Sequence, residues 1–185
     1  MAITLQSAKD AGIPIDDLAL PSTILWLDEV TDNDSGRIGY NEAGSTSSRV
    51  PGMNDQFPAN SGEAMTAAGL LCRTLLGQDP DTKRGLKQHA DLILRALPEW
   101  DPKAFGCDMY YWYYGSQAMF QMGGTHWEKW YAAMLPVVLE SQRSHGHAAG
   151  SWDPVGPWGY SGGRVYSTTL MLLCLEAPYR YARVH

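Results

Sequence analysis

The segment DMYYWYYGSQAMFQMGG, residues 108–124, is apolar on all sides when it is drawn as a helix. Two other segments share this property, namely SGEAMTAAGLLCRTLLG (61–77) and GRVYSTTLMLLCLEAPYRY (163–181). A helix without a polar stripe must be covered on most sides. We therefore expect these three helices to lie side by side in the interior of the fold.

Two amphipathic segments separate the three apolar ones. Both place large apolar residues at helical spacing and charged residues elsewhere. In TKRGLKQHADLILRAL (82–97) the apolar set is Leu86, Ala90, Ile93 and Leu97. In THWEKWYAAMLPVVLESQ (125–142) the set is Trp127, Trp130, Met134 and Val138. The alternation predicts helical hairpins, in which one helix of each pair forms an inner layer and the other an outer layer.

The apolar segments also align with one another at a period of about 50 residues. Thr66-Ala67-Ala68 matches Gly115-Ser116-Gln117 and Ser167-Thr168-Thr169, and large apolar residues follow each triplet. Residues 2–11 and 21–31 fit a degenerate first pair. The sequence thus predicts one all-α domain with seven helices and no significant β-sheet, either complete or part of a larger parent protein. Its approximate copies are 1–60, 61–106, 107–162 and 163–185.

Composition narrows the partners and the compartment. The formal net charge is −6 and no cluster of Arg or Lys occurs, which argues against nucleic acid as a partner. No apolar run reaches the roughly 18 residues that span a bilayer, and the N-terminus lacks the features of a signal peptide. Three scattered cysteines argue against a disulfide framework. We expect no transmembrane segment, and the compartment stays open, with the cytoplasm slightly favoured.

Four elements resemble the prenyltransferase and squalene-oxidase repeat of terpenoid cyclases and protein prenyltransferase β subunits. They are GRIGYNEAG (36–44), DMYYWYYGSQAMFQMGG (108–124), Gln142 followed by GSWDP (150–154), and GGRVYSTTLMLLCLE (162–176). The resemblance implies an α/α toroid, two concentric layers of helices. Complete barrels of that family contain more than seven helices, which implies a partial barrel here, completed by a larger parent protein or by a second copy in a homodimer.

The catalytic residues of the resembled enzymes are missing from this chain. The prenyltransferases hold zinc with Asp-x-Cys and a later His, whereas here Phe105 precedes Cys107 and Ser167 stands at the position of the His. The acidic DxDD motif of the cyclases is also absent. We therefore expect no metal and no cofactor, and the question of enzymatic activity stays open. Asp108 with Glu63 is the one acidic pair that a glycan-processing enzyme on a related α/α barrel would use.

Two weaker metal patterns favour ordinary surface roles. Asp32, Asp34, Gly36 and Glu42 resemble a calcium loop in which the glycine and the closing acid come early, so a solvated turn is the better interpretation. His145 and His147 form an H-x-H pair without an acidic or cysteine partner nearby in the sequence.

The aromatic segment itself has two interpretations. The face that carries Tyr110, Tyr114 and Gln117 is apolar along the side chains and polar at their tips. It is either packed core or a wall of the toroid cavity, where aromatic rings suit an apolar ligand. The candidate cavity-lining residues are Asp108, Tyr110, Tyr114, Gln117, Arg164, Tyr166, Trp152 and Trp158, of which the two tryptophans either roof the cavity or pin their loop to its rim.

Three functions remain open on these grounds. The first is a non-catalytic module that binds a protein partner or an apolar, isoprenoid-like molecule. The second is an enzyme of the cyclase or prenyltransferase type whose catalytic residues come from another half or another chain. The third is the glycan-processing enzyme.

Overall fold

The computed structural model describes residues 2–47, 51–52, 55, 62–102, 107–180 and 182–183. Seven helices form within these residues, which confirms the all-α prediction. Their bounds are α1 Ala2–Asp10, α2 Ala19–Glu29, α3 Ala64–Leu75, α4 Arg84–Ile93, α5 Met109–Met122, α6 Gly124–Glu140 and α7 Gly159–Arg180. In the described part of the chain, extended pairing is limited to one isolated bridge between Thr31 and Ile38.

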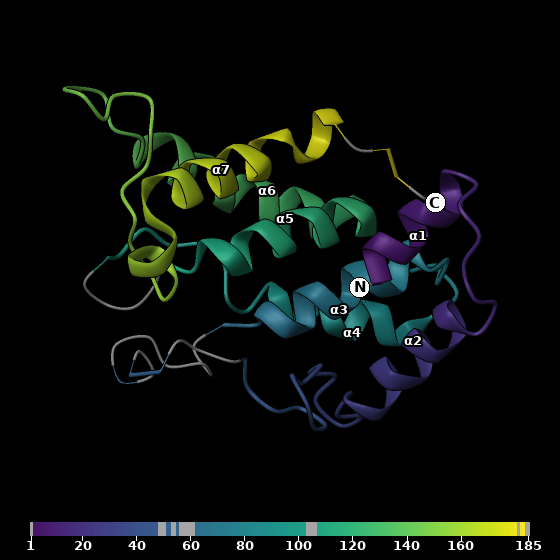
Figure 1. Cartoon of the computed structure of the whole chain (residues 1–185). Helices are drawn as coiled ribbons and strands as arrows, with labels where there is room; N and C mark the ends of the chain where they lie inside the picture. Colours follow the sequence, from purple (N-terminus) through teal and green to yellow (C-terminus); the bar gives the residue numbers. More distant parts are fainter. Residues whose placement is uncertain are drawn as a thin grey trace.

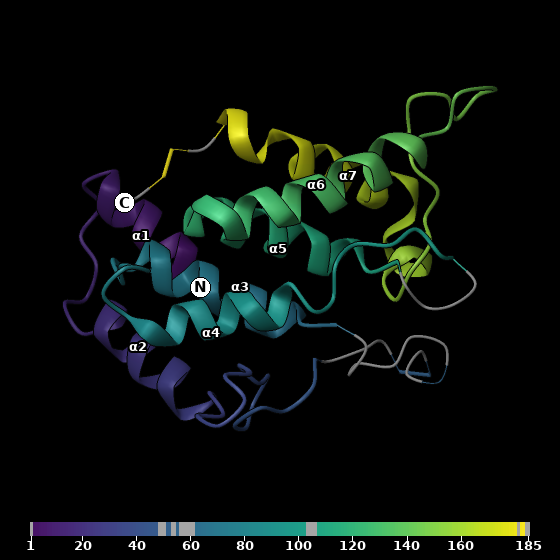
Figure 2. The same ribbon diagram turned by 180° about the vertical axis from the view of Figure 1, so that it is seen from behind.

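The helices form two layers. Figure 1 shows α3, α5 and α7 side by side on one face, and Figure 2 shows α4 and α6 on the opposite face. Helix α5 lies at the centre and contacts α3, α4, α6 and α7. Helices α1 and α2 pack against each other and extend the row beyond α3. The described helices form an open row of hairpins and do not close into a barrel.

The core is built around α5. Trp112 and Met119 of α5 are almost fully buried together with Trp130 and Met134 of α6. A second, smaller cluster of Leu27, Val30 and Ile38 packs against α3 near Cys72. None of the described helices combines the length and the apolarity needed to cross a membrane.

Each helix of the α3–α5–α7 row carries a buried Ser or Thr hydroxyl that forms a hydrogen bond with a residue from another segment, and that residue has a large apolar side chain. Thr66 Oγ1 accepts from the Ile38 amide at 3.3 Å. Ser116 Oγ accepts from the Trp130 indole nitrogen at 3.0 Å. Ser167 Oγ donates to the Trp152 carbonyl at 2.7 Å. The three contacts lie close to the aligned small residues of the sequence repeat.

Two details differ from the sequence predictions. Helix α7 begins at Gly159 rather than at 163, and Gly163, with φ of 64°, interrupts its first turns. Leu97 does not extend the apolar face of the second hairpin, because α4 ends at Ile93 and Leu97 is exposed. The segment 32–60, between the first and second predicted helix pairs, lies partly outside the described residues, and Phe105 also lies outside them.

Candidate functional site

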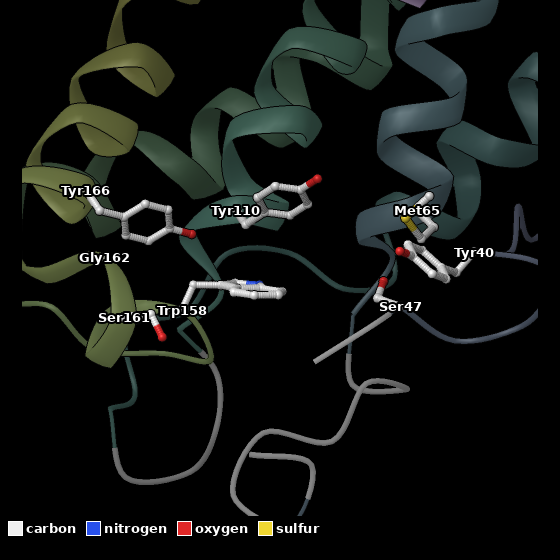
Figure 3. A pocket seen from close by; sticks show the side chains of 8 residues that line it. All are labelled: Tyr40, Ser47, Met65, Tyr110, Trp158, Ser161, Gly162 and Tyr166. Atoms are coloured by element: carbon white, nitrogen blue, oxygen red, sulfur yellow. The ribbon is translucent and has the colours of Figure 1, made fainter. Parts of the chain in front are cut away.

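A pocket of about 450 Å³ opens where α3, α5 and α7 begin. Figure 3 shows Tyr110 and Tyr166 above the ring of Trp158, with Tyr40 and Met65 facing them from the other side. The described residues that line it are Tyr40, Ser47, Met65, Tyr110, Trp158, Ser161, Gly162 and Tyr166. The wall is therefore largely aromatic, with hydroxyl groups at the tips of its side chains.

Helix α5 presents Tyr110 to the pocket because the helix starts just before it. The Asp108 carboxylate accepts a hydrogen bond from the Tyr111 amide at 3.1 Å and thereby caps the first turn. The Tyr110 ring makes an edge contact with Tyr114, at 4.8 Å between ring centroids. Tyr110 is thus held on two sides, by the helix start and by the next turn.

Trp158 reaches the pocket from the loop that precedes α7. Gly156, with φ of 86°, lies so close to the Cys107 carbonyl that a side chain at this position would collide with it. The Gly162 amide then donates to the Trp158 carbonyl at 2.9 Å. These contacts place the Trp158 ring 6.3 Å from the ring of Tyr110, measured between centroids.

The segment between α2 and α3 supplies the far wall. Ile38 packs on Gly69 of α3, where a Cβ atom would collide with the Ile38 side chain. Two residues later, the Tyr40 amide donates to Ser45 Oγ at 3.0 Å. This turn holds Tyr40 at the rim, where its ring is half exposed.

The structure brings three of the eight predicted residues together at the pocket, namely Tyr110, Trp158 and Tyr166. Asp108 caps α5 just behind it. Tyr114 lies one turn further along α5 beside Tyr110, and burial raises the pKa of its hydroxyl above the usual value.

The other three predicted residues have contacts away from the pocket. Gln117 Nε2 donates to the Leu173 carbonyl of α7 at 3.5 Å, so this face of α5 packs against a helix. Arg164 binds Asp153 at 2.7 Å and Ser151 at 3.1 Å within the preceding loop. Trp152 is buried, and its indole nitrogen donates to the Val138 carbonyl at 2.7 Å, which pins the loop to α6.

Five lining residues were not singled out from the sequence: Tyr40, Ser47, Met65, Ser161 and Gly162. Two of them lie in motifs that carry the family resemblance, Tyr40 in GRIGYNEAG (36–44) and Gly162 in GGRVYSTTLMLLCLE (162–176). Met65 and Ser161 have no distinguishing pattern, because they line the pocket only through their places in the first turns of α3 and α7.

The acidic pair proposed for glycan chemistry has structural contacts. Glu63 is buried, forms an ion pair with Arg37 and accepts a hydrogen bond from Thr66 Oγ1 at 2.7 Å. Asp108 caps α5. Neither carboxylate is among the described lining residues of the pocket.

Two further titratable groups are held in their neutral forms. Cys107 is fully buried, and burial raises the pKa of its thiol to about 12. His89 is buried with Nδ1 at 2.6 Å from the Gly36 carbonyl, and burial lowers its pKa to about 4. Among the described residues, no three His, Cys, Asp or Glu side chains come together as a metal site requires.

Comparison with family models, curated proteins and solved structures gave no match. The resemblance to the prenyltransferase and squalene-oxidase repeat therefore stays a prediction based on the quoted motifs.

Proposed function

We propose that this chain is a non-catalytic helical-repeat module, of the prenyltransferase and squalene-oxidase type, that binds an apolar small molecule. The ligand occupies the pocket lined by Tyr110, Trp158 and Tyr166. The observation that carries the proposal is the convergence of aromatic rings from three separate segments on one pocket of about 450 Å³. Ligand sites of this size are concave and mostly apolar, with a few polar groups that orient the ligand.

Binding without catalysis is supported by the composition of the wall. The described lining side chains include no carboxylate, imidazole, thiol or amine. Of the groups that act in general acid–base or nucleophilic catalysis, the described wall offers the hydroxyls of its serines and tyrosines, and a serine hydroxyl is a weak nucleophile without an adjacent base. The nearby Asp108 is buried and caps a helix, which suits a structural role.

Farnesol is a suitable first probe, because it is apolar, uncharged and isoprenoid-like. Titration calorimetry should detect its binding, and Tyr110→Ala should weaken it about tenfold or more through lost ring contact. Tyr179→Ala is the matched control, since Tyr179 is an exposed tyrosine near the other end of α7. Farnesol should be recovered unchanged after incubation, as shown by gas chromatography with mass detection.

Two results would contradict this proposal. Absence of farnesol binding, or equal weakening by both tyrosine variants, would remove the pocket as a ligand site. Conversion of farnesol to a product would contradict a non-catalytic role and favour the second function, an enzyme of the cyclase or prenyltransferase type.

A protein partner is the second candidate, and the outer face of α7 favours it. Val165, Leu172 and Tyr179 are 81%, 45% and 83% exposed and lie on one stripe of the helix. Val165 and Tyr179 are equally distant in sequence from Leu172, so the stripe can face its own copy in antiparallel orientation. We therefore take a second copy of this chain as the partner.

Sedimentation equilibrium tests this candidate. Leu172→Glu should convert a dimer to a monomer, because it buries a charge at the centre of the interface. Leu25→Glu is the matched control, since Leu25 is an exposed leucine on the distant helix α2. A wild-type monomer at high concentration would exclude self-association through α7.

A further inference from the structure

The indole nitrogen of Trp158 is buried without a hydrogen-bond partner. Two fully buried tryptophans show the usual arrangement: Trp130 donates to Ser116 Oγ and Trp152 donates to the Val138 carbonyl. In the part of the chain that the structure describes, Trp158 is the one tryptophan whose buried nitrogen lacks an acceptor. Buried N–H groups in folded proteins nearly always have one, so this donor calls for a partner from outside the chain.

The unused donor belongs to the wall of the aromatic pocket. Trp158 lines the pocket beside Tyr110, and the nitrogen lies on the ring edge that faces Tyr110 (Figure 3). The loop contacts of Gly156 and Gly162 hold the backbone of Trp158 in place. The nitrogen has no exposed surface in this structure, so a ligand in the pocket accepts this hydrogen bond once the Trp158 ring, whose nitrogen no bond holds, turns towards it.

The sign of the surrounding charge favours an acceptor over a cation. The described lining residues carry no formal charge. Met65 and Tyr110 are the second residues of α3 and α5, so the partly positive ends of two helices point to this region. An aromatic wall alone would also attract a cation, but the described wall holds no carboxylate to pair with one, and the nearby Asp108 is buried and caps α5. The lack of a lysine or arginine at the described wall likewise disfavours an anion.

We infer that the ligand of this pocket carries an uncharged carbonyl oxygen that accepts the hydrogen bond of Trp158 Nε1. Its apolar skeleton packs on Tyr110, Tyr166 and Met65. The inference rests on the proposed function, because it names the ligand class for the same pocket. It assigns Trp158 as the residue that selects carbonyl compounds over hydrocarbons of equal shape.

Acetophenone and ethylbenzene form a matched pair of probes, since they differ chiefly by the carbonyl oxygen. Acetophenone should bind about tenfold more tightly, the effect expected of one satisfied buried donor. In protein labelled with ¹⁵N-tryptophan, acetophenone should shift one of the seven indole N–H resonances strongly. Trp158→Phe should remove that resonance and reduce acetophenone binding to the level of ethylbenzene.

The outcomes separate the inference from the proposed function. Equal binding of the two probes, with ring shifts at Tyr110, would overturn the carbonyl inference and leave an apolar pocket. A preference for acetophenone that persists in Trp158→Phe would overturn the role of Trp158. Failure of both probes to bind would overturn the inference and the pocket together. Unchanged indole resonances of the other tryptophans would report that Trp158→Phe is folded. If this variant does not fold, the shift of a single indole resonance in the wild-type protein, or its absence, decides the inference.

Discussion

Helices α5 and α7 are both apolar in sequence, yet their environments differ. Helix α5 contacts four other helices, and Met119, Ala118 and Trp112 are almost fully buried. Helix α7 contacts α5 and α6, and its buried residues are confined to one side, where Met171 and Cys174 lie. An apolar helix is thus enclosed at the centre of a row and half open at its end. Position in the row, more than composition, decides how much of the helix is buried.

Truncation at the two positions gives the largest expected contrast. Met119→Ala should lower the free energy of unfolding by about 3 kcal/mol, because a fully buried side chain leaves a cavity. Leu172→Ala on the outer side of α7 should cost about 1 kcal/mol or less. Urea unfolding measures both, with an unchanged slope as the control for two-state behaviour. Equal costs would mean that α7 is as enclosed in solution as α5.

The same comparison explains what sequence reasoning can predict. Helical periodicity and the repeat spacing predicted seven helices and their order, because both are local properties. The exposure of Val165 and Tyr179 could not be predicted, since it depends on which neighbours α7 has. Within one loop, Trp152 enters the core and Trp158 the pocket wall. Which tryptophan is buried depends on how close each indole lies to α6 and to α5. The residues around each tryptophan do not determine those distances.

Acid should act on the opposite side of the row, where α4 covers α3. His89 has a folded-state pKa of about 4, below the 6.5 of an exposed histidine, because burial disfavours its charged form. The unfolded chain therefore binds more protons between these values, and stability falls as the pH drops from 6.5 towards 4. This single group should contribute a loss of about 3 kcal/mol across that window.

His89→Asn provides the matched control for the acid effect, because its amide keeps a donor near the Gly36 carbonyl and does not titrate. The pH dependence of urea unfolding should be shallower in this variant between pH 6.5 and 4. Identical slopes in the two proteins would show that the pKa of His89 is the same in the folded and the unfolded chain.

The buried hydroxyls of α5 and α7 allow a smaller and more exact comparison. Ser116→Ala deprives the Trp130 indole of its acceptor, and Ser167→Ala removes the donor to the Trp152 carbonyl. Each change should cost about 1–2 kcal/mol, because a buried polar group loses its partner. Ser116 aligns with Thr168 rather than with Ser167 in the repeat, but each serine holds one buried polar group of a tryptophan, so the two costs should agree within about 0.5 kcal/mol. A neutral change at either serine would argue against an equivalent role.

The smallest expected effect concerns the open side of α7 itself. Val165→Thr keeps the shape of an exposed side chain, so at low protein concentration it should change the free energy of unfolding by less than about 0.5 kcal/mol. At high concentration a dimer through α7 would bury Val165, and the hydroxyl would then carry a desolvation cost. The cost of Val165→Thr should therefore grow with protein concentration, since association stabilises only the folded chain. A cost that stays near zero at all concentrations would leave α7 as an open edge in solution, and the contrast with α5 would then be a property of the single chain.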